Sequence, residues 1–373
     1  VCAGEPEAAP PAVAGNTTNP DSLDHFAPAL QPVVTELLAL LAPEAPPPDL
    51  AKGCFLIAKL HRPRADDSAS VQALDQLVAK VRERLGAERD PEKAIAIINA
   101  ILYQDMGLQA RDQPFAEDYL LPVLLQDKVG RCAALSSLWL TLGQRLNLPL
   151  VGVCVPEHIF VRWETPAQGA QPAPARNIET TMGGKALEDA VYQQQRPWGD
   201  SERAAAFYGR PLTARQALAT YLSPLCSSLR DQGRVAEAIV IGRRAVALLP
   251  HDPEAWNNLG MCYRLNGQEP LALLAYQQAL RILPTFAEVW NNLGNLAQEP
   301  ATRIEHFRRA IQLRPSLGEA WRNLALAQYD AGRYAAARDS AAQAAERGAP
   351  LAPHYLKAIE RRAGEQAAPP GDH

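Results

Sequence analysis

Three features that would each define a class of protein are missing from this sequence. No apolar run reaches the length of about eighteen residues that a membrane-spanning helix needs, so we expect no transmembrane segment in the chain as given. The six cysteines show no Cys-x-x-Cys spacing, which excludes the usual zinc motifs and gives no sign of a disulfide framework. The net charge of −4 and pI near 6.0 give no reason to expect nucleic acid or an anionic membrane as a partner.

The chain does contain enough apolar sequence for a sizeable core. It has 373 residues, of which 47% are hydrophobic, so we expect two globular domains. Residues 1–25 are rich in Ala and Pro with few large apolar side chains, which predicts a disordered leader. The start, Val1-Cys2-Ala3, is similar to the end of a signal peptide. An exported or periplasmic location is therefore slightly favoured over a cytoplasmic one, and the alternative is a trimmed start.

Apolar residues recur at helical spacing in the first part of the chain. The periodicity predicts helices over residues 26–41 and 50–60. Capping residues mark two further helices, over 68–85 and from 90 to about 101. The region before Cys132 is therefore predicted to be mainly helical.

The pattern changes after the leucine-rich helix that we expect to follow Cys132. Residues 150–155 and 159–163 are short, β-branched runs separated by a proline, and a third run begins at residue 177. Helices followed by a small sheet predict an α+β domain.

A cysteine, a histidine and an acid lie where these elements begin. Cys132 precedes a run of leucines at helical spacing, and a helix N-terminus stabilises a thiolate. His158 directly precedes the second strand-like run, and Glu179 lies in the third. We therefore expect Cys132 to be a nucleophile, His158 its general base and Glu179 the group that orients the imidazole. Gln126 is a weaker candidate for donating to an oxyanion together with the backbone N–H of Cys132.

Simpler interpretations of these residues stay open. Cysteine is often just a small buried residue, and this is what we expect of the four that lie in apolar or helical patterns. These four are Cys54, Cys154, Cys226 and Cys262. By the same logic Cys132 could be a structural thiol, His158 a core histidine bonded to a carbonyl, and Glu179 a surface charge.

The second half of the chain is periodic. Trp256–Gly260 recurs as Trp290–Gly294 and, with changes, as Trp321–Ala325, at spacings of 34 and 31 residues. Prolines 250, 284 and 315 keep the same spacings. Tryptophan, small residues and a closing proline at these positions resemble the tetratricopeptide repeat, and they predict about four helix pairs. The third unit is three residues short, which predicts a tighter turn between its helices. Residues 351–362 are predicted to form a capping helix.

The motifs around the three candidate residues resemble a known family. Gly130-x-Cys132, Pro156-x-His158-x-Phe160 and Asn177-Ile178-Glu179-x-Thr181 are similar to bacterial transglutaminase-like domains, over roughly residues 50 to 200. The resemblance implies a papain-like core with a Cys–His–acid triad, and several such domains are fused to tetratricopeptide repeats. Two departures stand out: Glu157 occupies a position where glycine is common, and the acid is glutamate where aspartate is usual.

The sequence therefore predicts an α+β transglutaminase-like domain over residues 26–205 and an all-α tetratricopeptide-repeat solenoid over 206–365, with 366–373 as a loose tail. The expected activity is that of a cysteine protease, amidase or acyltransferase that works through a thioester without a metal or organic cofactor. The repeats are expected to bind a protein or peptide. The alternative is a non-catalytic scaffold in which the transglutaminase-like domain is inactive and only the repeats bind a partner.

Overall fold

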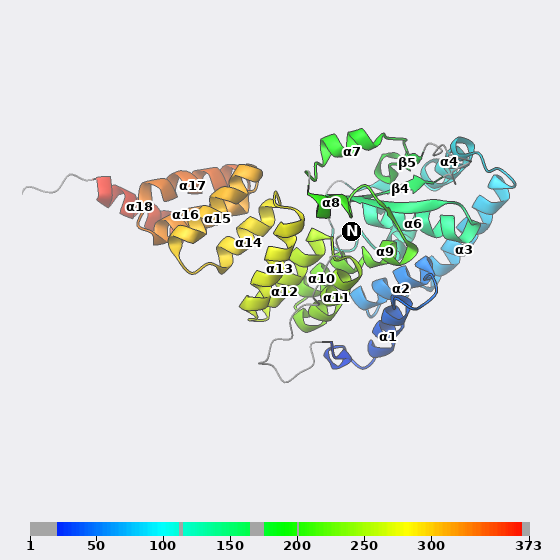
Figure 1. The fold of residues 1–373 in the computed structure, drawn as a ribbon, viewed down its shortest axis with the longest axis horizontal. Helices are drawn as coiled ribbons and strands as arrows, with labels where there is room; N and C mark the ends of the chain where they lie inside the picture. Colours follow the sequence, from blue (N-terminus) through cyan, green and yellow to red (C-terminus); the bar gives the residue numbers. More distant parts are fainter. Residues whose placement is uncertain (1–20, 112–114, 165–174, 200, 368–373) are drawn as a thin grey trace, which may run out of the picture. The chain divides into compact units, whose positions relative to one another are not determined.

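The structure is a computed structural model that describes residues 21–111, 115–164, 175–199 and 201–367. The chain divides into two compact units between Cys262 and Tyr263 (Figure 1). Cys2, the predicted signal-peptide end and most of the predicted leader lie outside the described residues.

Helices open the first unit, as the periodicity predicted. They are η1 (Leu23–His25), α1 (Gln31–Leu40), α2 (Leu50–His61), α3 (Ser68–Leu85), α4 (Pro91–Asn99) and the π-helical segment η2 (Ala100–Asp105). Asp90 caps α4 by accepting a hydrogen bond from the backbone N–H of Lys93, and α3 ends at Gly86, whose φ is 52°. The first helix begins later than predicted, because Pro32 at its start fits the first turn of a helix and residues 26–30 form turns before it.

A four-stranded antiparallel sheet lies at the centre of this unit. The next elements are β1 (Gln109–Ala110), α5 (Leu121–Asp127), β2 (Val129–Gly130), α6 (Cys132–Leu146), β3 (Leu150–Val155), β4 (His158–Trp163), β5 (Arg176–Ile178) and β6 (Pro211–Leu212). The strand order of the sheet is β5-β4-β3-β6, and β1 pairs with β2 separately. The predicted helix after Cys132 and the two main strands are confirmed, and the α+β class with them.

Both faces of the sheet are covered (Figure 1). The buried helix α6 packs against β3 and β4 on one face. On the other face Val153, Val155 and Phe160 form a cluster with Tyr192, whose ring lies 3.9 Å from that of Phe160. Tyr192 belongs to α7 (Asp189–Gln195), which follows the short turn η3 (Thr180–Met182). The strand ends near residues 158 and 179 are thereby held between two layers of helix.

The first unit ends in five helices, of which the last three carry the start of the repeat pattern. They are α8 (Glu202–Ala205), α9 (Ala214–Ala219), α10 (Leu222–Asp231), α11 (Val235–Leu248) and α12 (Pro253–Leu265), whose last residues extend into the second unit. Cys226 on α10 and Cys262 on α12 are fully buried, with their sulfur atoms 3.5 Å apart.

The second unit continues the repeat as packed helix pairs. They are α13 (Glu269–Ile282), α14 (Ala287–Leu296), α15 (Pro300–Leu313), α16 (Gly318–Asp330), α17 (Tyr334–Glu346) and α18 (Pro353–Ala367). The same hydrogen bond links the tryptophan and the proline in successive units. The indole N–H of Trp290 donates to the carbonyl of Pro284 at 3.0 Å, and that of Trp321 donates to the carbonyl of Pro315 at 2.9 Å. The predicted capping helix is present as α18, and it extends to Ala367, into the predicted tail.

The prediction of a tighter turn in the third unit is wrong. The turn 297–299 spans three residues, as do the turns 266–268 and 331–333 of the neighbouring units. The missing residues come from α14, which has 10 residues where α12 and α16 have 13. A helix shortened by about one turn of 3.6 residues keeps the face that packs against its neighbour, so the deletion leaves the turn unchanged.

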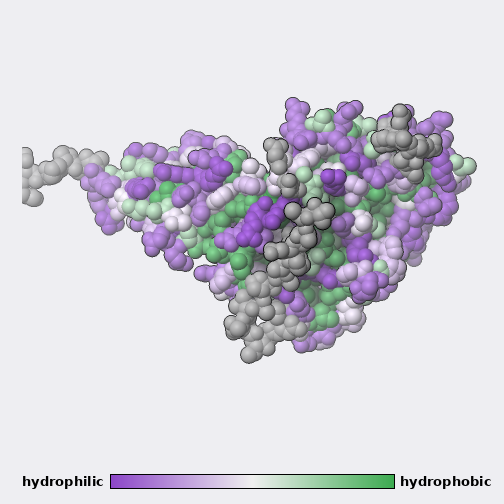
Figure 2. Space-filling model, viewed as in Figure 1, coloured by the Kyte–Doolittle hydropathy of each residue, from purple (hydrophilic) through white to green (hydrophobic). Residues whose placement is uncertain are grey.

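Hydrophilic residues cover most of the molecular face drawn in Figure 2. Among the described residues, no helix combines the length and the apolar character needed to cross a membrane.

Candidate active site

Cys132 is the first residue of α6, as the leucine spacing predicted. Arg131 precedes the helix in an extended conformation, and its side chain makes no capping hydrogen bond. The first N–H groups of a helix have no partner within it, so the N–H groups beside the Cys132 thiol remain available as donors. Gly130 fixes the chain path, because a Cβ there would lie 3.2 Å from that of Ala134 and 3.3 Å from the carbonyl oxygen of Asp118.

His158 and Glu179 lie next to each other at the ends of β4 and β5. Nε2 of the imidazole is 2.7 Å from Oε2 of Glu179, and both side chains are largely buried, 7% and 4% exposed. The thiol of Cys132 lines the same cavity as this imidazole, and each of the two groups shifts the pKa of the other. Because Nε2 is occupied by the carboxylate, Nδ1 is the ring nitrogen that can serve the thiol. The structure therefore brings together the three residues in the order thiol, imidazole, carboxylate.

The three groups shift one another's pKa values in mutually supporting directions. Burial raises the pKa of the Cys132 thiol, but its interactions with His158 and with the backbone near Ile159 outweigh burial and leave that pKa below its ordinary value. Burial lowers the pKa of His158, and its interactions with the Cys132 thiol and the Glu179 carboxylate overcome this effect and raise the pKa to about 9. Burial raises the pKa of Glu179, and the imidazole lowers it to a net value below the ordinary one. This arrangement favours a thiolate beside an imidazolium at neutral pH.

Glu179 is held in place by further hydrogen bonds to both of its oxygens. Oε1 accepts the backbone N–H of Thr181 at 2.9 Å and its hydroxyl at 2.5 Å, while Oε2 accepts the hydroxyl of Tyr192 at 3.1 Å. The loop after it is anchored by the hydroxyl of Tyr103, which donates to the carbonyl of Thr180 at 2.8 Å. Such donors keep a buried carboxylate ionised and fix its orientation.

Tyr192 and Tyr103 both support the Glu179 loop, but no sequence pattern predicted these roles. Each is an isolated tyrosine on a helical segment, so no local pattern distinguishes it from a core residue. Thr181 was visible, because it belongs to the Glu179-x-Thr181 motif.

The other described cysteines differ from Cys132 in accessibility. Cys132 is partly exposed, whereas Cys54, Cys154, Cys226 and Cys262 are buried, which confirms the prediction for those four. Burial raises the pKa of the Cys54 thiol to about 12 and that of Cys154 well above its ordinary value.

The structure does not bring Gln126 to the thiol. Its side chain is exposed on α5, and its amide nitrogen donates to the hydroxyl of Ser70 at 2.9 Å. The path from α5 through β2 to the start of α6 directs Gln126 toward α3, and it does not line the cavity that contains Cys132.

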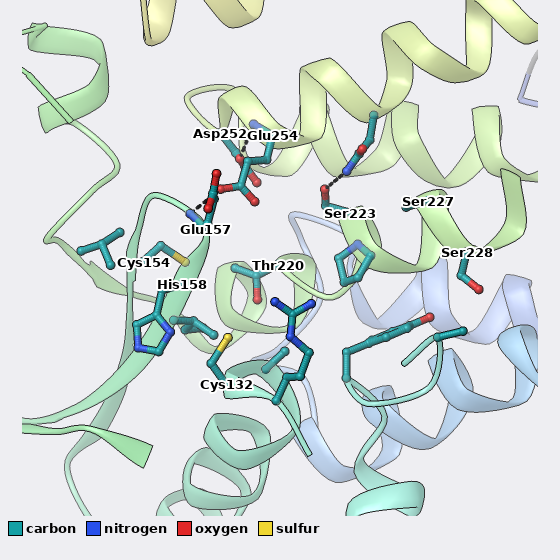
Figure 3. Close-up of a pocket in the computed structure, with 18 of the residues that line it drawn as sticks. Cys132, Cys154, Glu157, His158, Thr220, Ser223, Ser227, Ser228, Asp252 and Glu254 are labelled. Carbon is teal, nitrogen blue, oxygen red and sulfur yellow. Dashed lines mark hydrogen bonds between the residues drawn. The ribbon is translucent and has the colours of Figure 1, made fainter. Parts of the chain in front are cut away.

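Cys132 and His158 open into a cavity of about 800 Å³ (Figure 3). One wall is the hairpin between β3 and β4. The opposite wall comes from the repeat helices, with Ser223 and Ser227 on α10 and Asp252 and Glu254 at the start of α12. Within the described residues we find no group of three or more His, Cys, Asp or Glu side chains arranged to hold a metal ion.

The unusual Glu157 forms the turn of the β3–β4 hairpin. Its φ is 60°, in the left-handed region that favours glycine, which explains why glycine is common before the histidine. The backbone N–H of Glu157 donates to Oε1 of Glu254 at 2.7 Å, so the hairpin that carries His158 is bonded to α12.

Models of two protein families match separate segments of the chain. Residues 68–219 match the family model described as the transglutaminase-like superfamily. Residues 253–286 and 304–353 match models of the tetratricopeptide repeat.

Individual proteins are similar to this chain over part of its length. The chain is 27% identical over 212 residues to a UPF0162 protein of Pseudomonas aeruginosa, covering 52% of this chain and 74% of that protein. It is 26% identical over 243 residues to a UPF0162 protein of Xylella fastidiosa, covering 60% and 80%. Among solved structures, the MamA protein is 22% identical, covers 41% of this chain and 79% of its own, and superposes with a TM-score of 0.31.

Proposed function

We propose that this chain, a transglutaminase-like domain followed by tetratricopeptide repeats, uses Cys132 to cleave or transfer the acyl group of a carboxamide or peptide bond. The observation that supports the proposal most is a partly exposed thiol at a helix start that shares a cavity with an imidazole bonded to a buried carboxylate. Glu179 is in the position of the orienting acid of this family.

In the first half of the reaction the Cys132 thiolate attacks the carbonyl carbon and forms a C–S bond. The resulting oxyanion is stabilised by N–H groups at the start of α6, including that of Cys132 itself, with the positive end of the helix dipole behind them. The imidazolium of His158 then gives its proton to the departing nitrogen, so ammonia or an amine leaves and a thioester remains.

In the second half, neutral His158 takes a proton from water or from an amine, which attacks the thioester. The Cys132 thiolate leaves, and the product is a carboxylic acid or a new amide. Glu179 stabilises the imidazolium in both halves, because its carboxylate accepts a hydrogen bond from the Nε2–H group throughout.

The inactive-scaffold alternative predicts a different site. A buried charge costs stability. A domain without catalytic activity therefore gains nothing from a thiol whose pKa is lowered by its neighbours, or from a buried carboxylate held by four donors. Here Glu179 accepts bonds from His158, Tyr192 and two groups of Thr181. Such an arrangement is typical of functional sites. The repeats are modules that bind peptides or proteins, and we propose that they recruit the substrate.

Site-resolved alkylation tests the proposal. The folded protein is treated with iodoacetamide at pH 7 for increasing times, and mass spectrometry follows each cysteine. We expect Cys132 to react at least about 100-fold faster than Cys154, because only Cys132 is both accessible and ionised. His158→Ala should slow Cys132 strongly, while Ser227→Ala, on the opposite wall, should not.

Turnover is tested with glutamine-containing peptides and a fluorescent primary amine, following both ammonia release and amine incorporation. Loss of both signals in Cys132→Ala supports the proposal and their ratio separates hydrolysis from transfer. Equally slow alkylation of Cys132 and Cys154 in the native protein would leave the repeats as the only functional part.

A further inference from the structure

The cavity wall opposite Cys132 is acidic. Asp252 and Glu254 lie there, and Glu157 approaches them from the β3–β4 hairpin, as Figure 3 shows. Arg131 is the only lysine or arginine among the cavity-lining residues of the described chain. A fourth acid of the lining, Asp231, is already paired with Arg230 at 2.8 Å. When they are ionised, Asp252 and Glu254 therefore give this part of the cavity an excess of negative charge.

Asp252 and Glu254 accept hydrogen bonds only from the backbone. Asp252, 7% exposed, accepts the N–H of Glu254 at 2.9 Å and thereby caps α12. Glu254 accepts the N–H of Glu157. Neither makes an ion pair with any lysine, arginine or histidine of the described residues. Burial raises the pKa of both carboxyl groups, and the neighbouring Asp252 raises that of Glu254 further.

An independent feature of the same wall is an unsatisfied hydroxyl. Tyr208 lines the cavity and is 3% exposed, and its hydroxyl has no hydrogen-bond partner among the described residues. Burial raises the pKa of this phenol, and the nearby Glu254 and Asp252 raise it further. A buried hydroxyl without a partner costs roughly 1–3 kcal/mol, so such groups usually have one when a site is filled.

We propose that Asp252, Glu254 and Tyr208 form a subsite for a positively charged group of the substrate, an alkylammonium or a guanidinium. Such a group has several N–H donors and a positive charge, which match two carboxylates and a hydroxyl oxygen without a partner. The subsite and Cys132 line one cavity, so the cation lies near the carbonyl that the thiol attacks. The inference rests on the proposed function and specifies its substrate class.

A helix of the repeat region would then take a direct part in selecting the substrate. Asp252 and Glu254 lie at the start of α12, while the thiol lies on α6. Repeat and transglutaminase-like domain would then act on one substrate within one cavity, instead of recruiting and reacting separately.

Charged methanethiosulfonate reagents test the subsite without requiring turnover. The Cys132 thiolate displaces methanesulfinate and forms a mixed disulfide with the rest of the reagent. Rates are measured for a trimethylammonium, a sulfonate and a neutral methyl reagent. Each charged rate is divided by the neutral rate, which cancels changes in the amount of thiolate. The same reagents with 2-mercaptoethanol correct for intrinsic reactivity.

At a pH above the raised pKa values of Asp252 and Glu254, we expect the corrected cation-to-anion ratio at Cys132 to be about tenfold or more, because the carboxylates attract one reagent and repel the other. Glu254→Gln and Asp252→Asn should each lower it at least about threefold. Both are isosteric, and asparagine still caps a helix. Asp75→Asn removes the same charge from the exposed face of α3 and should leave the ratio unchanged. A ratio near one, or one that neither variant lowers, overturns the subsite.

Failure of the proposed function has a separate signature in the same data. The neutral reagent would then react with Cys132 no faster than with 2-mercaptoethanol at neutral pH, whatever the charge ratio. The two outcomes are therefore distinguishable.

Protection from the neutral reagent identifies the source of the cation. Acetyl-Gln-Lys-amide, acetyl-Gln-norleucine-amide and butylamine are compared. Protection by the lysine peptide alone assigns the cation to the acyl donor, and equal protection by butylamine assigns it to the amine acceptor. Loss of the preference for lysine over norleucine in Tyr208→Phe and Glu254→Gln supports the subsite, and equal protection by all three compounds contradicts it.

Discussion

Replacing Glu179 by glutamine removes one charge from the triad and little of its shape. The carboxylate is 2.7 Å from His158 Nε2 and helps to raise the pKa of His158 to about 9. A hydrogen bond between charged groups contributes about 1.5–3 kcal/mol, and one pKa unit corresponds to about 1.36 kcal/mol. The pKa of His158 should therefore fall by about 1–2 units. The population of the thiolate–imidazolium pair should fall by about 10- to 100-fold relative to that of the neutral thiol–imidazole pair.

The assay is the rate of Cys132 alkylation by iodoacetamide from pH 5 to pH 10. In the parent protein the reactive thiolate should be present below the ordinary pKa of a thiol, because the lowered thiol pKa and the raised imidazole pKa stabilise the pair between them. In Glu179→Gln the rate at pH 6 should fall about tenfold or more. Above pH 9.5 the two profiles should converge, because the thiol is ionised there whether or not the imidazole is charged.

Glu188→Gln provides the matched control, since it removes the same charge from an exposed position just before α7. Tyr192→Phe removes one of the donors to Glu179 and should have a smaller effect in the same direction. Thermal unfolding checks that each variant is folded. Superimposable profiles of the parent and Glu179→Gln at pH 6 would refute the idea that this carboxylate stabilises the imidazolium.

Three further predictions concern stability. Gly294→Ala should destabilise the second unit by about 1–3 kcal/mol in urea unfolding, because the new Cβ would lie 2.4 Å from the ring of Phe307; no loss would mean that the two helices separate freely. Glu157→Gly should raise the unfolding free energy by up to about 1 kcal/mol by relieving the φ of 60°, and a loss would show that the side chain matters more. Burial raises the pKa of Glu254 above its usual 4.5, so the folded state holds a proton that the unfolded state releases, and stability should decline as the pH rises from 4.5 through the raised value. The slope of this decline in unfolding free energy is at most about 1.4 kcal/mol per pH unit for one group. Glu254→Gln should reduce the slope, and an unchanged slope would show that another group causes the decline.

Local patterns in the sequence determined the elements and the repeat. The spacing of leucines after Cys132, the cap at Asp90 and the stop at Gly86 depend on residues within a few positions of each other, and all three features are found in the structure. The recurring tryptophan and proline predicted the helix pairs for the same reason, because their hydrogen bond joins residues six positions apart.

The candidate triad could be assembled from the sequence only because the order of elements restricts the fold. A helix start and the ends of two adjacent strands lie close together in a domain of this kind, so Cys132, His158 and Glu179 were expected to meet. The same reasoning failed for Gln126, since the direction of α5 relative to α3 depends on packing between residues far apart in the chain.

What only the tertiary structure decided is the environment of the thiol. Tyr192 and Tyr103 reach the Glu179 loop from helices with no shared motif. Asp252, Glu254 and Tyr208 meet across long separations in sequence to form the acidic wall. Burial and the sum of neighbouring charges fix the pKa of such groups, and both depend on every element packed around them. The sequence by itself thus determined the residues that can react, and the packing of α12 against the β3–β4 hairpin decided which charges surround them.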